Sequence, residues 1–140
     1  MKIKSLPIKG AFEVELVDLN DSRGTFKRLF CSKELDGMTS SKQIVQINAS
    51  ETFQKGSIRG MHFQNSPRSE IKLIQCIQGS VFDVMIDLRK SSNTFLAKEC
   101  VTLVTADIHP EQPSSRPFKS FASEPGNIKK FGNFKLSYKL

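Results

Sequence analysis

Short runs in which apolar and polar residues alternate recur along the chain and predict β-strands. Between residues 12 and 19, for example, Phe12 and Val14 alternate with Glu13 and Glu15, the pattern of a strand with one face toward water. Residues 31–41 are mixed in character and predict no more than a helical turn near 33–35. Without sustained helical periodicity, the chain is predicted to be an all-β sandwich or jelly roll. Further strands are predicted at 25–30, 43–48, 57–64, 71–78, 80–88 and 94–104.

Turn residues separate these runs and predict how the strands pair. Asn20-Asp21-Ser22-Arg23-Gly24 has turn chemistry. A hairpin about Pro67 would place His62 opposite Lys72, and a two-residue turn at Gln78-Gly79 would place Lys72 opposite Met85. Asp83 would then lie one diagonal step from Lys72. His62, Lys72 and Asp83 are therefore predicted to line one sheet surface.

These three side chains suit proton transfer next to a carbonyl group. A neutral imidazole such as that of His62 takes up a proton near neutral pH, and the Lys72 ammonium can hold the oxyanion formed when a carbon beside a ketone loses its proton. A single strand histidine is more often structural, and a Lys–Asp pair is more often a structural ion pair. The residues alone leave both interpretations open.

Predicted strand 43–48 carries a second group of polar side chains. Val45 and Ile47 are expected to pack on one face, while Gln46 and Asn48 project from the other. Amides on an inward face need partners, because an unsatisfied buried amide is costly. A nucleotide base or sugar would satisfy Gln46 and Asn48, and so would backbone groups.

Length and composition bound the class of protein. The chain has 140 residues, enough for one domain with its own core, and a net charge of +7 without a long basic block. The charge suits an anionic ligand such as a nucleotide diphosphate, and nucleic-acid binding is not expected because aromatic and basic residues do not alternate. No apolar run reaches membrane-spanning length and no signal-peptide core is present, so the expected location is the cytoplasm. The three cysteines lack metal-like spacing.

One motif resembles a known family. Arg59-Gly60-Met61-His62-Phe63-Gln64 is similar to the Arg-Gly-x-His-x-Gln signature of the dTDP-4-dehydrorhamnose 3,5-epimerases, a family with a cupin-type jelly-roll fold. The similarity extends from about residue 8 to residue 104, and an ordered series of motifs is far more specific than any one of them. The other family-like segments are Asp21-Ser22-Arg23-Gly24-Thr25-Phe26, Gln46-Ile47-Asn48-Ala49-Ser50, Lys55-Gly56-Ser57-Ile58, Glu70-Ile71-Lys72-Leu73 and residues 79–89.

The resemblance implies an activity and a role for several residues. The substrate would be similar to dTDP-4-keto-6-deoxyglucose, with His62 as base, Lys72 as enolate stabiliser and Tyr138 as the opposing acid. It implies a homodimer that exchanges N-terminal strands near residues 12–19, and no cofactor. A metal is not expected, because Gln64 stands where metal-binding cupins have the second histidine of His-x-His. The residues implied to hold the nucleotide sugar are Arg23, Phe26, Gln46, Asn48 and Arg59, with Asp83 in support.

The resemblance ends after residue 104. The chain is expected to be a single domain over residues 1–140, with a family-like core at 8–104 and a divergent tail at 105–140. Relatives continue beyond the segment that contains Tyr138 and supply an aspartate that orients the histidine, so Asp83 or Asp87 would have to take that role here. The shortened tail leaves two alternatives: a non-catalytic or degenerate nucleotide-sugar-binding cupin, and a 3,4-ketoisomerase, which Gln64 disfavours.

Overall fold

The computed structural model describes residues 1–105, 119–123 and 135–139, the last two segments through their backbone. Ten strands and one helix lie within these residues, which confirms the predicted all-β class. The elements are β1 (Lys2–Ser5), β2 (Ala11–Glu15), β3 (Asp18–Asp21), β4 (Gly24–Lys27), α1 (Ser32–Thr39), β5 (Gln46–Ser50), β6 (Lys72–Cys76), β7 (Ser80–Ile86), β8 (Lys98–Val104), β9 (Lys119–Ser123) and β10 (Lys135–Lys139).

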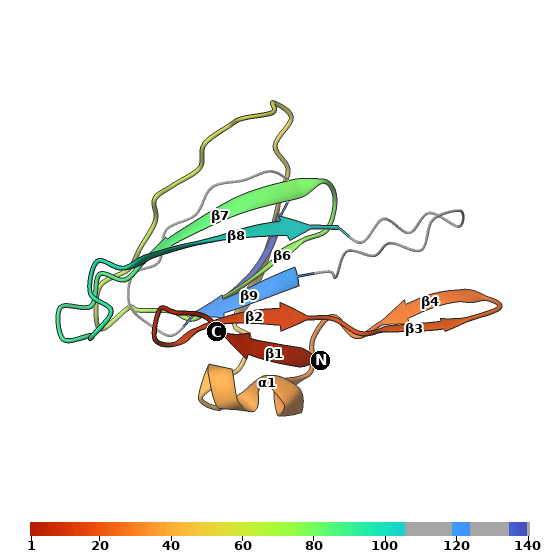
Figure 1. Cartoon of the computed structure of the whole chain (residues 1–140), viewed down its shortest axis with the longest axis horizontal. Helices are drawn as coiled ribbons and strands as arrows, with labels where there is room; N and C mark the ends of the chain where they lie inside the picture. The colour runs from red at the N-terminus through yellow and green to blue at the C-terminus, as the bar shows by residue number, and fades with distance from the viewer. Residues whose placement is uncertain (106–118, 124–134, 140) are drawn as a thin grey trace.

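The main layer is a six-stranded sheet. Its strand order is β1-β2-β9-β6-β10-β5, and every neighbouring pair is antiparallel. The hairpin β7–β8 forms a second layer above this sheet, as Figure 1 shows. Strand β6 lies inside the large sheet, so both of its edges are hydrogen-bonded.

The two faces of the large sheet pack against different partners. Successive strand residues point to opposite faces. On β6, Ile74 and Cys76 join the core cluster that includes Val81 and Leu103 of the β7–β8 hairpin. Leu73 points the other way, into a second cluster with residues of β2 and α1. Strand β6 is therefore buried on both sides, and the β7–β8 side forms the interior of a sandwich.

Helix α1 covers the second face. The sequence predicted only a helical turn at 33–35, but the helix runs for eight residues, from Ser32 to Thr39. Leu35 and Met38, three residues apart, lie on one side of the helix and are buried against Val14 and Leu73. The helix ends at Ser40, whose positive φ of 51° is the left-handed conformation that commonly terminates helices.

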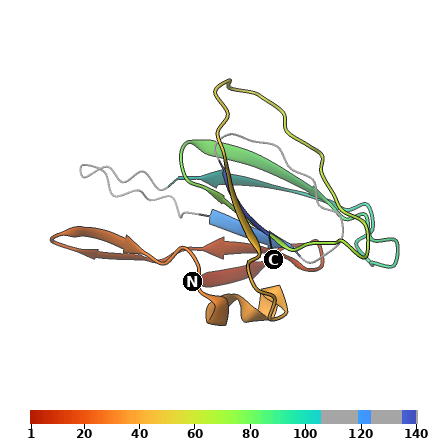
Figure 2. The same cartoon turned by 180° about the vertical axis from the view of Figure 1, so that it is seen from behind.

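The hairpin β3–β4 confirms the turn predicted at residues 20–24. Asp21 pairs with Gly24, so Ser22 and Arg23 form the two-residue loop. Gly24 has a φ of 139°, a conformation that a side chain would strain. The hairpin extends away from the two-layer body in both views (Figures 1 and 2).

The predicted strand at 57–64 is absent, and the hairpin about Pro67 is therefore wrong. The whole segment 51–71 connects β5 to β6 without a strand (Figure 1). A strand has only two edges, and β9 and β10 occupy both edges of β6. Lys72 consequently lies opposite Ser123 and Lys139, and not opposite His62.

The second predicted hairpin, about Gln78-Gly79, is also wrong. Gly79 does mark a turn, with a φ of 79°, but this turn carries the chain from one sheet to the other. Strand β7 pairs with β8, where Met85 faces Glu99 and Asp83 faces Val101. The predicted pairing of Lys72 with Met85 is lost because β6 and β7 belong to different layers.

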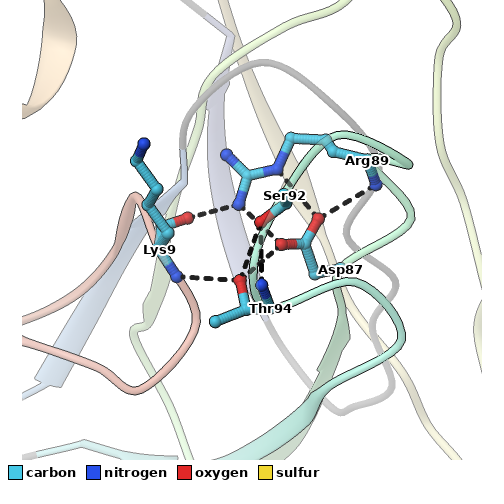
Figure 3. A network of polar contacts seen from close by, with 5 residues as sticks. All are labelled: Lys9, Asp87, Arg89, Ser92 and Thr94. Atoms are coloured by element: carbon cyan, nitrogen blue, oxygen red, sulfur yellow. Dashed lines mark hydrogen bonds and ion pairs between the residues drawn. The ribbon is translucent and has the colours of Figure 1, made fainter.

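A buried polar network shapes the loop between β7 and β8 (Figure 3). The Asp87 carboxylate accepts hydrogen bonds from Arg89 Nε at 2.8 Å, Arg89 Nη2 at 2.8 Å and Thr94 Oγ1 at 2.6 Å. Arg89 Nη2 also donates to the backbone carbonyl of Lys9. These bonds tie residues 87–97 to the turn before β2, and β8 begins at Lys98, four residues later than predicted.

Candidate functional site

Three of the predicted site residues share the inner face of the large sheet. Directly opposed residues of antiparallel strands point to the same face. Lys139 of β10 lies opposite Lys72 on one side and Gln46 on the other, and Asn48 lies one row further on. Gln46, Asn48 and Lys72 therefore lie on the face that also carries Ile74, which is the face toward β7–β8.

Strand β5 exposes its side chains in a way the sequence did not predict. Val45 and Ile47 were expected to pack, yet both are exposed, and Ile44 packs against the second core cluster instead. The polar pair on the other face is also exposed, and Gln46 Nε2 donates to Asn48 Oδ1 at 3.0 Å. β5 is an edge strand of the sheet, and because the side chains of Gln46 and Asn48 are exposed, their amides are accessible to a ligand.

Lys72 is held by a neighbour that the sequence analysis gave no role. Its Nζ lies 2.7 Å from Oε1 of Glu70, whose side chain is 9% exposed while that of Lys72 is 26% exposed. Both residues lie in the family-like segment Glu70-Ile71-Lys72-Leu73, but their contact is seen only in the structure. A half-buried ammonium on a sheet face suits the binding of a developing oxyanion.

Asp83 reaches the same interior from the opposite layer. It is buried, and it lies between Val81 and Met85 on the same face of β7, both of them members of the core cluster between the layers. The prediction that Lys72 and Asp83 share one sheet surface is wrong, because β6 and β7 belong to different sheets. The two residues instead lie on facing surfaces of the two layers, Lys72 on β6 and Asp83 on β7.

His62 and Arg59 lie on the strandless segment 51–71. Within the described residues, no hydrogen bond or ion pair holds the His62 ring, which is exposed. Arg59 donates through Nε to Thr52 Oγ1 and through Nη2 to the Glu51 carbonyl, both at 3.0 Å. A guanidinium has five N–H donors, so these bonds leave Arg59 able to contact an anion.

Arg23 and Phe26 lie apart from this interior, on the hairpin β3–β4. Arg23 Nη2 lies 2.6 Å from Asp21 Oδ2, and hydrogen bonds from Arg23 lower the pKa of that carboxyl. Phe26 pairs with Leu19 across the hairpin, and each of these apolar side chains is 62% exposed. The hairpin thus presents a cation and an apolar pair away from its own body.

The remaining candidates are Tyr138 and Asp87. The side chain of Tyr138 lies outside the described part of the structure, and its backbone lies in β10 opposite Leu73 and Ile47. Asp87 is fully occupied by Arg89 and Thr94, which removes it as a substitute support for His62. The divergent tail predicted at 105–140 lies mostly outside the described residues.

The described part of the chain lacks two further features. No three His, Cys, Asp or Glu side chains in it are grouped closely enough to hold a metal ion. None of its helices has the length and apolar character that crossing a membrane requires.

A family model and a curated relative that match this chain have the same name. The family model for dTDP-4-dehydrorhamnose 3,5-epimerase matches residues 5–109. A curated relative of that name from Mycobacterium tuberculosis is 36% identical over 115 residues, covering 76% of this chain and 53% of the relative. This chain spans about half the length of the curated relatives it matches.

Solved structures are also similar. The crystal structure of dTDP-4-dehydrorhamnose 3,5-epimerase from Elizabethkingia anophelis has a TM-score of 0.82 and 28% identity, and the match covers 99% of this chain and 73% of that one. A Legionella pneumophila epimerase in complex with dTDP-4-keto-L-rhamnose has a TM-score of 0.79 and 27% identity, with coverage of 99% and 70%. These similarities confirm the predicted cupin-type jelly-roll architecture.

Proposed function

Because the chain belongs to the dTDP-4-dehydrorhamnose 3,5-epimerase family, we propose that it epimerises a dTDP-4-keto-6-deoxy sugar at the carbons beside the ketone. The observation that carries this proposal is the meeting of Lys72, Gln46 and Asn48 on one sheet face, opposite the buried Asp83 of β7. This interior combines a cation with neutral hydrogen-bonding groups. It has the chemistry needed to hold an enolate and a nucleotide sugar.

Lys72 stabilises the intermediate in the proposed reaction. A ketone at carbon 4 acidifies the protons on carbons 3 and 5, and the negative charge left by their removal collects on the ketone oxygen. The Lys72 ammonium, partly shielded from water on the inner face of the sheet, donates a charge-assisted hydrogen bond to that oxygen. The reaction needs no redox cofactor, because the proton that leaves is replaced by another and the oxidation state of the sugar is unchanged.

His62 and Tyr138 move the protons. Neutral His62 removes a proton from one side of the sugar ring, and Tyr138 returns a proton from the opposite side, which inverts the carbon. His62 lies on segment 51–71. The backbone register pairs Tyr138 of β10 with Leu73, which faces α1, so the role of Tyr138 in the reaction rests on the family motif and not on this register. Asp83 supports the site from β7 as the buried carboxylate of the facing layer.

Arg59, Gln46 and Asn48 hold the nucleotide diphosphate. Arg59 forms charge-assisted bonds to phosphate oxygens with the guanidinium N–H groups that Thr52 and Glu51 leave available. The amides of Gln46 and Asn48, accessible on the edge strand, take the base or sugar. The Legionella relative with bound dTDP-4-keto-L-rhamnose supports this ligand class.

Arg23 and Phe26 act in a homodimer. The exposed Leu19–Phe26 pair lies on a hairpin that extends away from its own body, so it is available to a second copy of the chain (Figure 1). Docking of the hairpin on that copy buries the apolar pair and brings Arg23 to the partner's nucleotide site. The proposed setting is the cytoplasm, in deoxysugar synthesis for dTDP-rhamnose and cell-surface polysaccharide.

Product analysis separates this proposal from its alternatives. The purified chain is incubated with dTDP-4-keto-6-deoxyglucose and the sugar is identified by NMR. Inversion at carbon 3 or carbon 5 supports the epimerase, whereas a ketone moved to carbon 3 identifies a ketoisomerase. An unchanged sugar that nevertheless binds identifies a nucleotide-sugar-binding protein. One observation favours that last alternative: His62 has no carboxylate partner among the described residues.

A further inference from the structure

We infer that Glu70 is a positioning residue for the proposed reaction: its carboxylate fixes the direction in which the Lys72 ammonium meets the substrate oxygen. This inference rests on the proposed role of Lys72. The carboxylate and ammonium are 2.7 Å apart, which is within direct hydrogen-bonding distance. Glu70 lies two residues before Lys72, the first residue of β6, in the connection that leads into that strand.

Burial distinguishes this ion pair from most others in the chain. The Glu70 side chain is 9% exposed, whereas Lys2–Glu15 and Arg23–Asp21 lie largely in water. An ionised carboxylate this well covered is stable only with charged or hydrogen-bonding partners. Its interaction with Lys72 is therefore screened less than a surface pair would be.

The need for such a partner follows from the chemistry of lysine. A lysine ammonium ends a flexible four-carbon stem and has three rotatable donors, so on its own it samples many directions. A carboxylate beside the ammonium offsets part of the electrostatic attraction between the ammonium and an enolate. This effect by itself would weaken stabilisation of the enolate. The gain from Glu70 is consequently one of orientation, and orientation contributes strongly to catalytic rates.

A second pair supplies a matched control. Glu13 of β2 is 12% exposed and lies 3.9 Å from Lys4, so it is a glutamate of similar burial paired with a lysine elsewhere in the same sheet. Glu13→Gln removes a carboxylate without touching Lys72. A general effect of lost charge or lost stability would therefore be seen in both variants.

The test compares deuterium uptake from D2O into dTDP-4-keto-6-deoxyglucose by wild type, Glu70→Gln, Glu70→Asp and Glu13→Gln. We expect Glu70→Gln to lower kcat by about 10-fold to 100-fold, with KM and dTDP affinity unchanged. Glu70→Asp keeps the charge on a shorter stem and is expected to fall between wild type and Glu70→Gln. Glu13→Gln is expected to keep the wild-type rate.

Each other outcome has a defined meaning. A wild-type kcat in Glu70→Gln, or an effect on KM alone, overturns the role of Glu70 and leaves the proposed function standing. If Glu70→Gln fails to fold while Glu70→Asp turns over at the wild-type rate, Glu70 is purely structural and the inference is overturned. Absence of label with the wild-type chain overturns the proposed function, and the inference with it.

Discussion

Arg89 holds both carboxylate oxygens of Asp87, with its Nε 2.8 Å from Oδ1 and its Nη2 2.8 Å from Oδ2. The carboxylate is fully buried, so its ionised form is stabilised by this bidentate pair with Arg89 and by the hydroxyl of Thr94. Burial alone raises the pKa of Asp87, but hydrogen bonds from Arg89, Ser92 and Thr94 outweigh it and hold the pKa far below its ordinary value of 3.8.

The first prediction concerns stability at low pH. A carboxylate whose folded-state pKa is depressed stabilises the fold above its ordinary pKa, and this contribution is lost as the pH falls toward the folded-state value. Urea unfolding of the wild type is expected to show a lower free energy of unfolding as the pH falls. The free energy of unfolding of Asp87→Asn is expected to change less over the same pH range. Arg89→Ala strands the buried carboxylate and should cost about 3–5 kcal/mol near neutral pH. An Arg89→Ala chain as stable as wild type would contradict the assignment.

Leu96 gives a second prediction, of a stabilising substitution. It has a φ of 62°, the left-handed conformation that costs a residue with a Cβ roughly 1–2 kcal/mol, and its side chain is 62% exposed. Leu96→Gly removes this strain, although a glycine also gives the unfolded chain more freedom. We expect a gain of about 0.5–1 kcal/mol in urea unfolding. Phe95→Gly, one residue earlier, serves as the control and should give no gain.

The hairpin β3–β4 leads to a prediction about assembly. Phe26→Lys places a charge on the exposed Leu19–Phe26 pair and is expected to convert a dimer to a monomer, as measured by light scattering. Phe82→Lys, at an exposed position on the outer face of β7, should leave the dimer intact. A wild-type chain that is already monomeric at high concentration would contradict the proposed homodimer.

Arg59 provides a prediction for ligand binding. Arg59→Ala removes a guanidinium proposed to contact the diphosphate, and hydrogen bonds to charged groups contribute roughly 1.5–3 kcal/mol. Calorimetric titration with dTDP should therefore show an affinity about 10-fold to 100-fold weaker. The matched control is Arg68→Ala, an exposed arginine on the same segment. Equal losses in the two variants would indicate a general effect of charge and argue against a specific contact.

Local patterns in the sequence were sufficient for most of the elements. The alternation predicted as a strand over residues 12–19 corresponds to β2, which ends earlier, at Glu15. The turn chemistry at 20–24 corresponds to the β3–β4 loop, and the apolar runs at 80–88 and 94–104 contain β7 and β8. The epimerase-like motifs likewise identified the family, which the match over residues 5–109 confirms. These features depend on neighbouring residues or on short motifs.

Strand partners could not be predicted in the same way. Both wrong hairpins assumed that runs adjacent in sequence pair with each other, whereas Lys72 of β6 pairs with Ser123 and Lys139, far along the chain. Glu70 was missed for a related reason, since its role depends on the burial that those distant strands create. The placement of Lys72 and Asp83 on facing layers is visible only in three dimensions.

The central claim is that His62 removes a proton from a carbon next to the ketone of a dTDP-sugar. The most direct measurement is deuterium incorporation from D2O into dTDP-4-keto-6-deoxyglucose, followed by NMR for wild type and His62→Ala. We expect label at carbon 3, at carbon 5 or at both with the wild type, and almost none with His62→Ala. Equal label with both proteins would contradict the role of His62, and no label with a wild type that still binds dTDP would contradict the epimerase activity.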